Sequence, residues 1–240
     1  MKIRIRFTKT EDMRFIGHLD MMRFFQKVMR RAGVDICYSG GFSPHQIMSF
    51  AAPLGVGLTS HAEYVDIEVH STESSSVMID RINASLTEQV QVVSYRRLAD
   101  DTPAAMSCVA AADYTIGPHS AEYRTEWQQI VAGIPGFLAQ DVIPVTKQTK
   151  KGERTIDIRP LIYRMETEDD EDGYSVIRLQ AAAGSVDNLK PGLVMDTLRG
   201  YLGLEPAPFA TQICREEVYA LSGRETPRFV SLESLGEDIE

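Results

Sequence analysis

The sequence has few cysteines, and they are not arranged for metal binding or disulfide formation. Cys37, Cys108 and Cys214 are far apart, their number is odd, and no C-x-x-C pair occurs. This usage argues against a disulfide framework, a zinc ribbon and a cysteine-ligated iron–sulfur cluster. We therefore expect a cytoplasmic protein with no metal and no cofactor of its own.

Long apolar runs and targeting signals are missing as well. Residues 49–58 form the least polar run, which is short and is interrupted by Pro53, Gly55 and Gly57. The chain begins with alternating charged and apolar residues, unlike a signal peptide. We expect no membrane-spanning segment.

Common catalytic and nucleotide-binding signatures are also absent. Neither G-x-x-x-x-G-K-[ST] nor G-x-G-x-x-G occurs, and there is no G-x-S-x-G nucleophile elbow. His18, His45 and His61 match no metal-ligand spacing. Hydrolytic covalent catalysis and a metal centre are therefore not expected.

The chain lacks an overall basic charge but has a local one. Lys and Arg number 25 against 34 Asp and Glu, so the net charge is −9 and gives no whole-chain signature of a nucleic-acid binder. Residues 1–50 nevertheless carry a net +5, and the remainder carries −14. Two interpretations stay open: the first segment faces a polyanion, or its cations pair with acidic neighbours in the fold.

The length and composition are typical of two globular domains, with 240 residues, 43% hydrophobic and 25% charged. Apolar residues alternate from Ile3 to Phe7, which predicts a strand, and a helical spacing from Leu19 to Arg31, followed by Gly33, predicts a helix. The other elements predicted in this half are strands at 34–38, 63–69 and 90–95, and a helix that starts near Ser74–Ser76.

This order is β-α-β-β-α-β, the split βαβ arrangement of a ferredoxin-like domain. In that arrangement the first and third strands are antiparallel neighbours. Lys2, Arg4 and Arg6 are then expected to face Asp66 and Glu68, and such ion pairs would neutralise part of the local basic charge.

A second domain of the same kind is expected after a boundary near Asp101–Ala105. We predict an α+β fold of two ferredoxin-like (split βαβ) domains with antiparallel sheets, at residues 1–103 and 104–222, followed by an acidic tail at 223–240. The tail is expected to be loosely held, and the alternative is that Leu232, Leu235 and Ile239 dock it as a short helix. The elements predicted in the second domain are strands at 112–116, 174–181 and 211–221, helices at 123–134 and 191–202, and a hairpin with arms at 142–149 and 155–164.

The segment from Arg14 to Asp20 places a histidine and a carboxylate at a predicted helix N-terminus. Exposed amides and the positive end of the helix dipole favour a bound anion there. His18 is suited to hydrogen bonding or to acid–base chemistry near neutral pH, with Asp20 orienting it. In the structural alternative, Asp20 only complements the dipole and His18 caps the helix or packs.

A glycine-rich connection of more than 20 residues follows this helix. Its paired glycines allow positive φ, and successive amides with two hydroxyl groups can form an anion-binding nest. So long a connection is uncommon in a compact domain unless it is functional, although a structural crossover is the alternative. We expect it to join the helix start in one anion site, with contacts from Arg14, His18, Arg30, Arg31, Ser39, Gly40, Gly41, Ser43 and His45.

Basic residues also cluster at the tip of the predicted hairpin in the second half: Lys147, Lys150, Lys151 and Arg154. A projecting basic hairpin can lie along a phosphate backbone. Charged residues also occupy exposed turns for solubility alone, so both interpretations stay open.

Five local motifs resemble a family of bacterial proteins called radical SAM-linked. They are F-x-G-H-L-D (15–20), R-R-A-G (30–33), Y-S-G-G-F-S-P-H (38–45), S-F-A-x-P-L-G-V-G (49–57) and A-E-Y-V-D-I-E (62–68). In that family the domain is fused to, or encoded beside, a radical S-adenosylmethionine protein, and some members are encoded near an RNase of the E/G type. The resemblance implies a radical SAM partner and suggests RNA metabolism by association.

The chain has no C-x-x-x-C-x-x-C run, so it would be an accessory to that enzyme. Our leading hypothesis is a non-catalytic RNA-binding or substrate-presenting module. One alternative is a metal-independent ribonuclease or small-molecule enzyme, with His18 or His45 as general base and Asp20 as its partner. The other is a scaffold that docks the radical SAM protein through residues 42–50, without nucleic acid.

Overall fold

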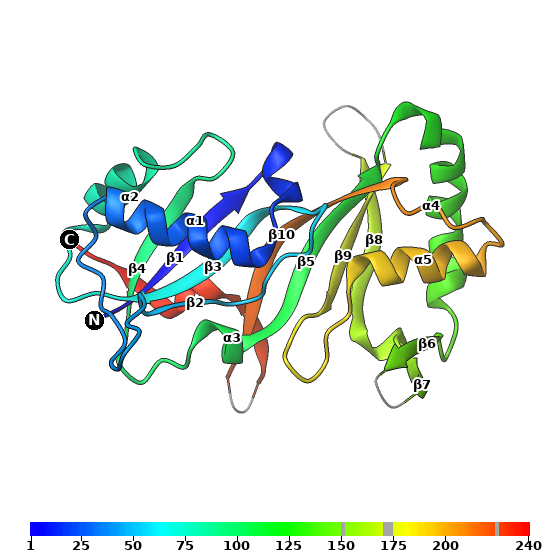
Figure 1. Ribbon diagram of the computed structural model, residues 1–240. Coiled ribbons are helices and arrows are strands. Elements are labelled where there is room, and N and C mark those ends of the chain that lie inside the picture. Colours follow the sequence, from blue (N-terminus) through cyan, green and yellow to red (C-terminus); the bar gives the residue numbers. More distant parts are fainter. Residues whose placement is uncertain (150–151, 170–174, 224–225) are drawn as a thin grey trace. The chain divides into compact units, whose positions relative to one another are not determined.

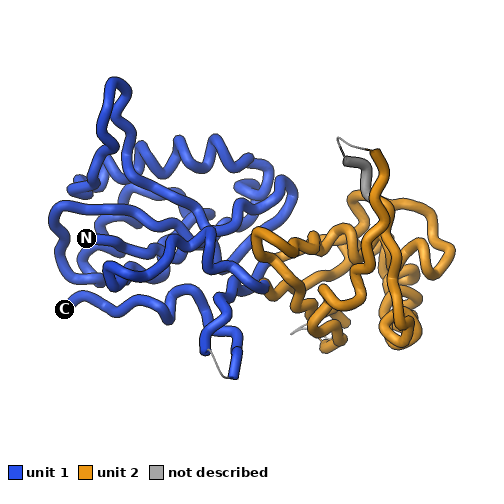
Figure 2. Tube along the Cα trace, turned by 90° about the horizontal axis from the view of Figure 1, so that it is seen from below, with its two compact units in different colours: residues 1–111, 215–240 blue, residues 112–214 orange. Residues whose placement is uncertain are grey.

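The computed structural model describes residues 1–149, 152–169, 175–223 and 226–240. The chain has an α+β fold and divides into two compact units, Met1–Ala111 with Arg215–Glu240, and Ala112–Cys214 (Figure 2). No helix among the described residues is both long and apolar enough to cross a bilayer.

The first unit is built around three strands and two helices (Figure 1). Strand β1 (Lys2–Lys9) lies between β4 (Val92–Leu98) and β3 (Thr59–Glu68), and both neighbours are antiparallel to it. The remaining elements of this unit are η1 (Glu11–Phe15), α1 (His18–Arg31), β2 (Met48–Phe50), α2 (Ser75–Asn83), α3 (Ala105–Cys108), β11 (Arg228–Ser231), η4 (Leu232–Leu235) and β12 (Gly236–Asp238).

The second unit combines four strands of the main sheet with a separate hairpin. Strand β5 (Val109–Pro118) enters it from the first unit, and β10 (Thr211–Ser222) returns to the first unit. Its other elements are η2 (Ala121–Tyr123), α4 (Arg124–Leu138), β6 (Pro144–Thr149), β7 (Gly152–Asp157), η3 (Arg159–Leu161), β8 (Ile162–Asp169), β9 (Ser175–Ala182) and α5 (Pro191–Tyr201).

Strand pairing among the described residues gives one large ten-stranded sheet and the two-stranded sheet β6–β7. The order in the large sheet is β12-β4-β1-β3-β10-β5-β9-β8, with β2 paired to β3 and β11 paired to β10. The α+β prediction is confirmed.

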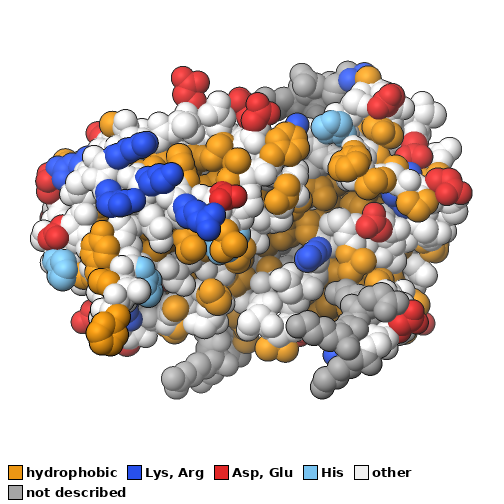
Figure 3. All heavy atoms as spheres, viewed as in Figure 1, with side chains coloured by type: hydrophobic (Ala, Val, Ile, Leu, Met, Phe, Trp, Pro, Cys, Tyr) orange, Lys and Arg blue, Asp and Glu red, His pale blue; other side chains and the backbone are white. Residues whose placement is uncertain are grey.

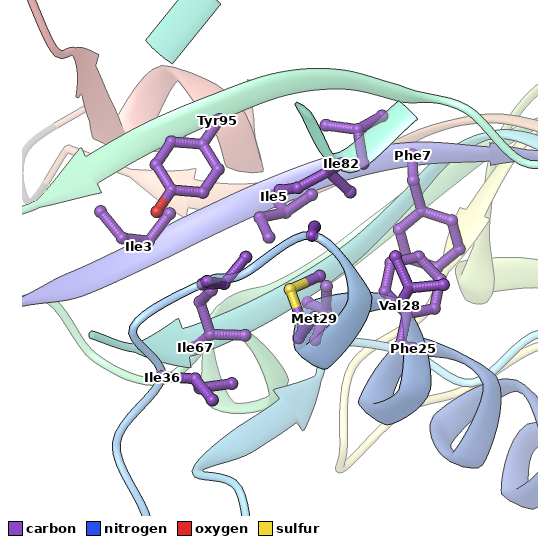
Figure 4. Close-up of a cluster of buried hydrophobic side chains, with 14 of the residues drawn as sticks. Ile3, Ile5, Phe7, Phe25, Val28, Met29, Ile36, Ile67, Ile82 and Tyr95 are labelled. Carbon is purple, nitrogen blue, oxygen red and sulfur yellow. The ribbon is translucent and has the colours of Figure 1, made fainter. Parts of the chain in front are cut away.

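Alternation along β1 sorts its side chains onto two differently covered faces. Ile3, Ile5 and Phe7 point to the helices and pack with Phe25, Val28 and Met29 of α1 (Figure 4). Each is almost completely buried, which stabilises a side chain of this size by about 1.5–3 kcal/mol. This side of the sheet is the apolar core of the unit.

The opposite face of β1 carries the charges predicted to pair across the sheet. Arg4 faces Asp66, with Nε and Nη2 donating to the two carboxylate oxygens at 2.8 and 2.9 Å. Arg6 lies opposite Tyr64 and pairs not with the predicted carboxylates but with Glu217 at 3.5 Å and with Glu233 at 3.2 Å. Lys2 lies opposite Glu68, but its Nζ donates to the Asp100 carbonyl at 2.8 Å. Ion pairing within the fold therefore accounts for these two arginines.

The C-terminal residues are held on the fold through the short helix η4, which agrees with the docked alternative and not with a loose tail. Arg4 Nη1 donates to the carbonyl of Leu232, whose side chain is fully buried, and β12 pairs with β4. Docking of Leu232 follows from its apolar character, whereas the contact of the Glu233 carboxylate with Arg6 is one that composition alone does not predict.

Three other expectations about elements were wrong. Residues 34–38 form only single bridges, Ile36 with Val69 and Tyr38 with Gln46, because neighbouring residues of the segment pair with different parts of the chain. The predicted second hairpin arm is interrupted by η3, since Pro160 has no N–H to donate, and Ile162 begins β8. Helix α4 continues through Pro135 to Leu138.

Candidate functional site

Helix α1 presents a cationic face to solvent. Met21, Phe25, Val28 and Met29 are buried beneath the helix, and the basic residues fall on the other side because they recur at helical spacing. Figure 3 shows basic side chains gathered over α1. The exposed residues of this basic face are Arg23, Lys27, Arg30 and Arg31.

The charge of the basic face is only weakly compensated. Arg23 pairs with Asp20 at 3.1 Å, but both side chains are about two-thirds exposed, so the pair contributes little to stability. Arg30 donates to a carbonyl of its own helix. Neither Lys27 nor Arg31 has an ion-pair partner in the described parts of the chain.

The first part of the glycine-rich connection is a closed loop with an aromatic tip. The Ser39 amide donates to the His45 carbonyl at 2.8 Å, and the Ser39 hydroxyl lies 2.9 Å from Nδ1 of His45. Gly41 has φ +98°, which a side chain would strain. Held in this way, the loop exposes the Phe42 ring fully and half of Tyr38.

This aromatic loop (residues 38–45) is attached to the middle of α1. Gln46, directly after it, is buried and donates through Nε2 to the Gln26 carbonyl at 3.2 Å. His18 is eight residues before Gln26, about 12 Å along the helix. The loop therefore joins the fold beside the basic face.

The helix start is instead met by the second part of the connection. The Gly57 amide donates to the Arg14 carbonyl at 2.8 Å, and the His18 ring lies edge-on to Phe50 with 5.3 Å between centroids. The structure thus divides the expected single anion site into two places, one at residues 38–45 and one at residues 50–57.

The three candidate catalytic residues have different partners. Asp20 binds Arg23, His45 binds Ser39, and the half-buried His18 packs on Phe50. His61 pairs with Glu216 at 2.7 Å. The structure gives His18 no hydrogen bond to Asp20 or His45 among the described residues.

A small cavity of about 10 Å³ lies beside His18 and is lined by motif residues. Its lining comprises Phe7, Lys9, His18, Met21, Phe50, Pro53, Leu54 and Glu63. His18, Phe50, Pro53, Leu54 and Glu63 come from three of the five sequence motifs, which therefore meet in one place.

Sequence reasoning missed the buried ionic cluster next to this cavity. Lys9 Nζ donates to the Ile16 carbonyl at 2.8 Å, and burial lowers the pKa of Lys9 despite the nearby charge of Glu63. Glu63 binds Arg215, which also donates to the Ala52 carbonyl at 2.7 Å. The alternation of β1 indicated which side of the strand Lys9 occupies, but no local signal could indicate Arg215.

The basic hairpin is only partly described. Lys147 lies in β6 opposite the exposed Arg154 of β7, and Lys150 and Lys151 lie outside the described residues. Its role in anion binding stays a prediction.

Comparison with known proteins gives one family match. A family described as "Uncharacterized protein conserved in bacteria (DUF2344)" matches residues 2–191, which include the basic face, the aromatic loop and all residues that line the cavity. No curated protein matches the chain.

Proposed function

The chain belongs to the DUF2344 family of bacterial proteins, and we propose that it is a non-catalytic RNA-binding or substrate-presenting module that works with a separate radical SAM enzyme. The supporting observation is the basic face of α1 together with the exposed ring of Phe42, whose loop is attached to Gln26 of the same helix through Gln46. Cations attract phosphates, and an exposed aromatic ring can stack on an unpaired base.

Single-stranded RNA is the form that this surface fits. Sequence-tolerant binding of single strands combines a basic track with aromatic stacking, whereas the bases of a duplex are already stacked. Phe42 is fully exposed and contributes no buried area to the fold. Its exposure is therefore better explained by a ligand than by stability.

The first test removes charge from the basic face. In Lys27→Gln/Arg31→Gln, we expect weaker binding of a single-stranded RNA oligonucleotide in fluorescence anisotropy, and a log–log salt slope smaller by about 0.7 per lost phosphate contact. Lys190→Gln/Arg228→Gln removes the same charge from exposed positions elsewhere and is the control. Equal losses in both double variants would contradict a defined site.

The second test removes the stacking ring. Phe42→Ala is expected to weaken single-strand binding by about 1–3 kcal/mol if the ring stacks on a base. Phe209, which is 80% exposed, supplies the matched control Phe209→Ala. Wild-type affinity in Phe42→Ala would leave only the electrostatic part of the proposal.

The radical SAM partner rests on the motif resemblance. Co-purification of that enzyme, with and without replacement of residues 40–45, tests whether the aromatic loop docks it. A complex that forms on the loop while RNA binding is absent would favour the scaffold alternative. RNA cleavage that survives a chelator and disappears in His18→Ala or His45→Ala would favour the ribonuclease alternative.

We further propose that each unit is a variant of the split βαβ arrangement. In the first unit the order β4-β1-β3-β2, with antiparallel pairs, is the one expected of a ferredoxin-like domain. The second unit has the sheet order β10-β5-β9-β8. When its strands are counted along the chain, this is fourth, first, third and second, the same order as in the first unit.

A further inference from the structure

The lining of the cavity beside His18 combines two charged residues with mostly apolar ones. Phe7, Met21, Phe50 and Leu54 form the wall, and Lys9 and Glu63 also line the cavity. Lys9 is only 3% exposed and Glu63 only 5%. Charged groups buried this deeply require partners, because their transfer out of water is costly.

The buried ionic cluster carries more positive than negative charge. Glu63 is bound by Arg215, which is itself buried, and the charge of Glu63 also acts on the nearby Lys9. An ammonium has three N–H donors. In the described part of the chain Lys9 makes one hydrogen bond, to the Ile16 carbonyl, and two donors have no protein acceptor.

The start of α1 adds to the positive potential. The N-cap is Gly17, which has no side chain, and no side-chain hydrogen bond caps the helix. The first amides of a 14-residue helix and its dipole then point their positive end at whatever lies before it. Lys9 binds Ile16, directly before this cap, so the ammonium and the helix start are adjacent.

We propose that this cavity seats one oxygen of an oxyanion, a phosphate or a carboxylate, which accepts hydrogen bonds from the buried Lys9 ammonium at the start of α1. A volume of about 10 Å³ has room for a single oxygen atom, so the rest of the phosphate or carboxylate ligand lies outside the cavity. Of the residues that line the cavity, Pro53 is exposed and His18 is partly exposed, so the lining reaches the surface at these two residues.

This oxyanion site is independent of the RNA-binding face. The seated oxygen would accept the hydrogen bonds that Lys9 has left to donate and would bring negative charge to its buried ammonium. Burial, and after it the charge of Arg215, lowers the pKa of Lys9, while the charge of Glu63 opposes this shift. The site would give one role to the cavity residues that come from three of the five sequence motifs.

The test is a titration of ¹⁵N-labelled protein with inorganic phosphate and, separately, with acetate, at constant ionic strength set with sodium chloride. We expect saturable shifts of the His18 and Leu19 amide signals and of the Lys9 ammonium signal. Comparing the affinities for phosphate and for acetate shows whether the site prefers a tetrahedral or a planar oxyanion. Lys9→Met, of similar shape without the charge, is expected to weaken binding at least ten-fold.

The control Lys27→Gln/Arg31→Gln should leave this affinity unchanged, which separates the site from the RNA-binding face. The proposal is overturned if neither anion shifts these signals, which would assign the cavity to a water molecule. Equal affinity in Lys9→Met would overturn it as well. If Lys9→Met does not fold, the Lys9 ammonium signal of the wild-type protein decides: amide shifts without an ammonium shift exclude the site.

Discussion

Arg4 illustrates how a single residue is stabilised in an apolar setting. Its side chain is fully buried, and although burial alone would lower its pKa, hydrogen bonds to Asp66 and the charge of that residue raise it. The third contact, from Nη1 to the Leu232 carbonyl, leaves the guanidinium well satisfied. Removing Asp66 would be strongly destabilising, because it would leave the charge of Arg4 unpaired inside the protein.

We therefore predict that Asp66→Ala lowers the free energy of unfolding by about 3–5 kcal/mol, measured by urea denaturation. Asp238→Ala, which removes the exposed partner of Arg96, is the control and should cost less than about 1 kcal/mol. Similar losses in the two variants would mean that burial does not determine the value of the Arg4–Asp66 pair.

The raised pKa values of two buried tyrosines allow a prediction of how the stability of the protein changes at alkaline pH. Burial, followed by the charge of Glu217, raises the pKa of Tyr64, and burial raises the pKa of Tyr95. A phenol with a raised pKa in the folded state contributes stability below its unfolded pKa of 10.0, and that stability is lost as the pH rises further.

Absorbance at 295 nm should therefore show that Tyr64 and Tyr95 ionise only when the protein unfolds above about pH 10. Tyr64→Phe should reduce the fall in stability in that range. Reversible ionisation of all nine tyrosines with unchanged circular dichroism would refute this prediction.

At the scale of the element, α1 combines an apolar face, a basic face and a glycine stop. Gly33 follows the helix with φ +64°, a conformation that costs a side chain about 1 kcal/mol. The Val34 amide then turns back to the Met29 carbonyl at 3.0 Å, and Val34 is buried. The glycine thus directs the chain from the helix toward the aromatic loop.

Gly33→Ala is expected to lower the free energy of unfolding by about 1 kcal/mol. Gly200→Ala provides a control of opposite sign. Gly200 lies inside α5 with free space around it, so alanine should stabilise that helix by up to about 1 kcal/mol. Thermal unfolding of both variants compares the two signs directly.

For the molecule as a whole, the C-terminal segment completes the first unit. Residues 228–240 add β11, η4 and β12, and they supply the Leu232 carbonyl to Arg4 and the Glu233 carboxylate to Arg6. The family match ends at residue 191, before this segment. The two ends of the chain are therefore energetically linked.

We expect Leu232→Ala to lower the stability of the protein by about 2–5 kcal/mol, because it leaves a cavity under a fully buried position. Leu221, which is 57% exposed, provides the control Leu221→Ala, with an expected effect below about 1 kcal/mol. A Leu232→Ala protein as stable as the wild type would show that η4 is only loosely attached.

The local sequence pattern was sufficient to predict whether a side chain is buried wherever its environment depends mainly on its own helix or strand. The alternation of Ile3, Ile5 and Phe7 predicted the buried face of β1, and the strand order predicted that Arg4 faces Asp66. Helical spacing predicted α1, although Leu19, expected in its apolar stripe, is exposed. Leu19 is the second residue of α1, and in this first turn the apolar spacing did not predict burial.

The amino-acid sequence by itself determined which faces of β1 and α1 are apolar and which are charged, because periodicity encodes a side chain's direction. Only the tertiary structure decided which stretch of the glycine-rich connection reaches the helix start. It alone brought Arg215 to Glu63 and Leu232 to Arg4. Those contacts join residues more than 150 positions apart, and their energy depends on burial that exists only after the chain has folded.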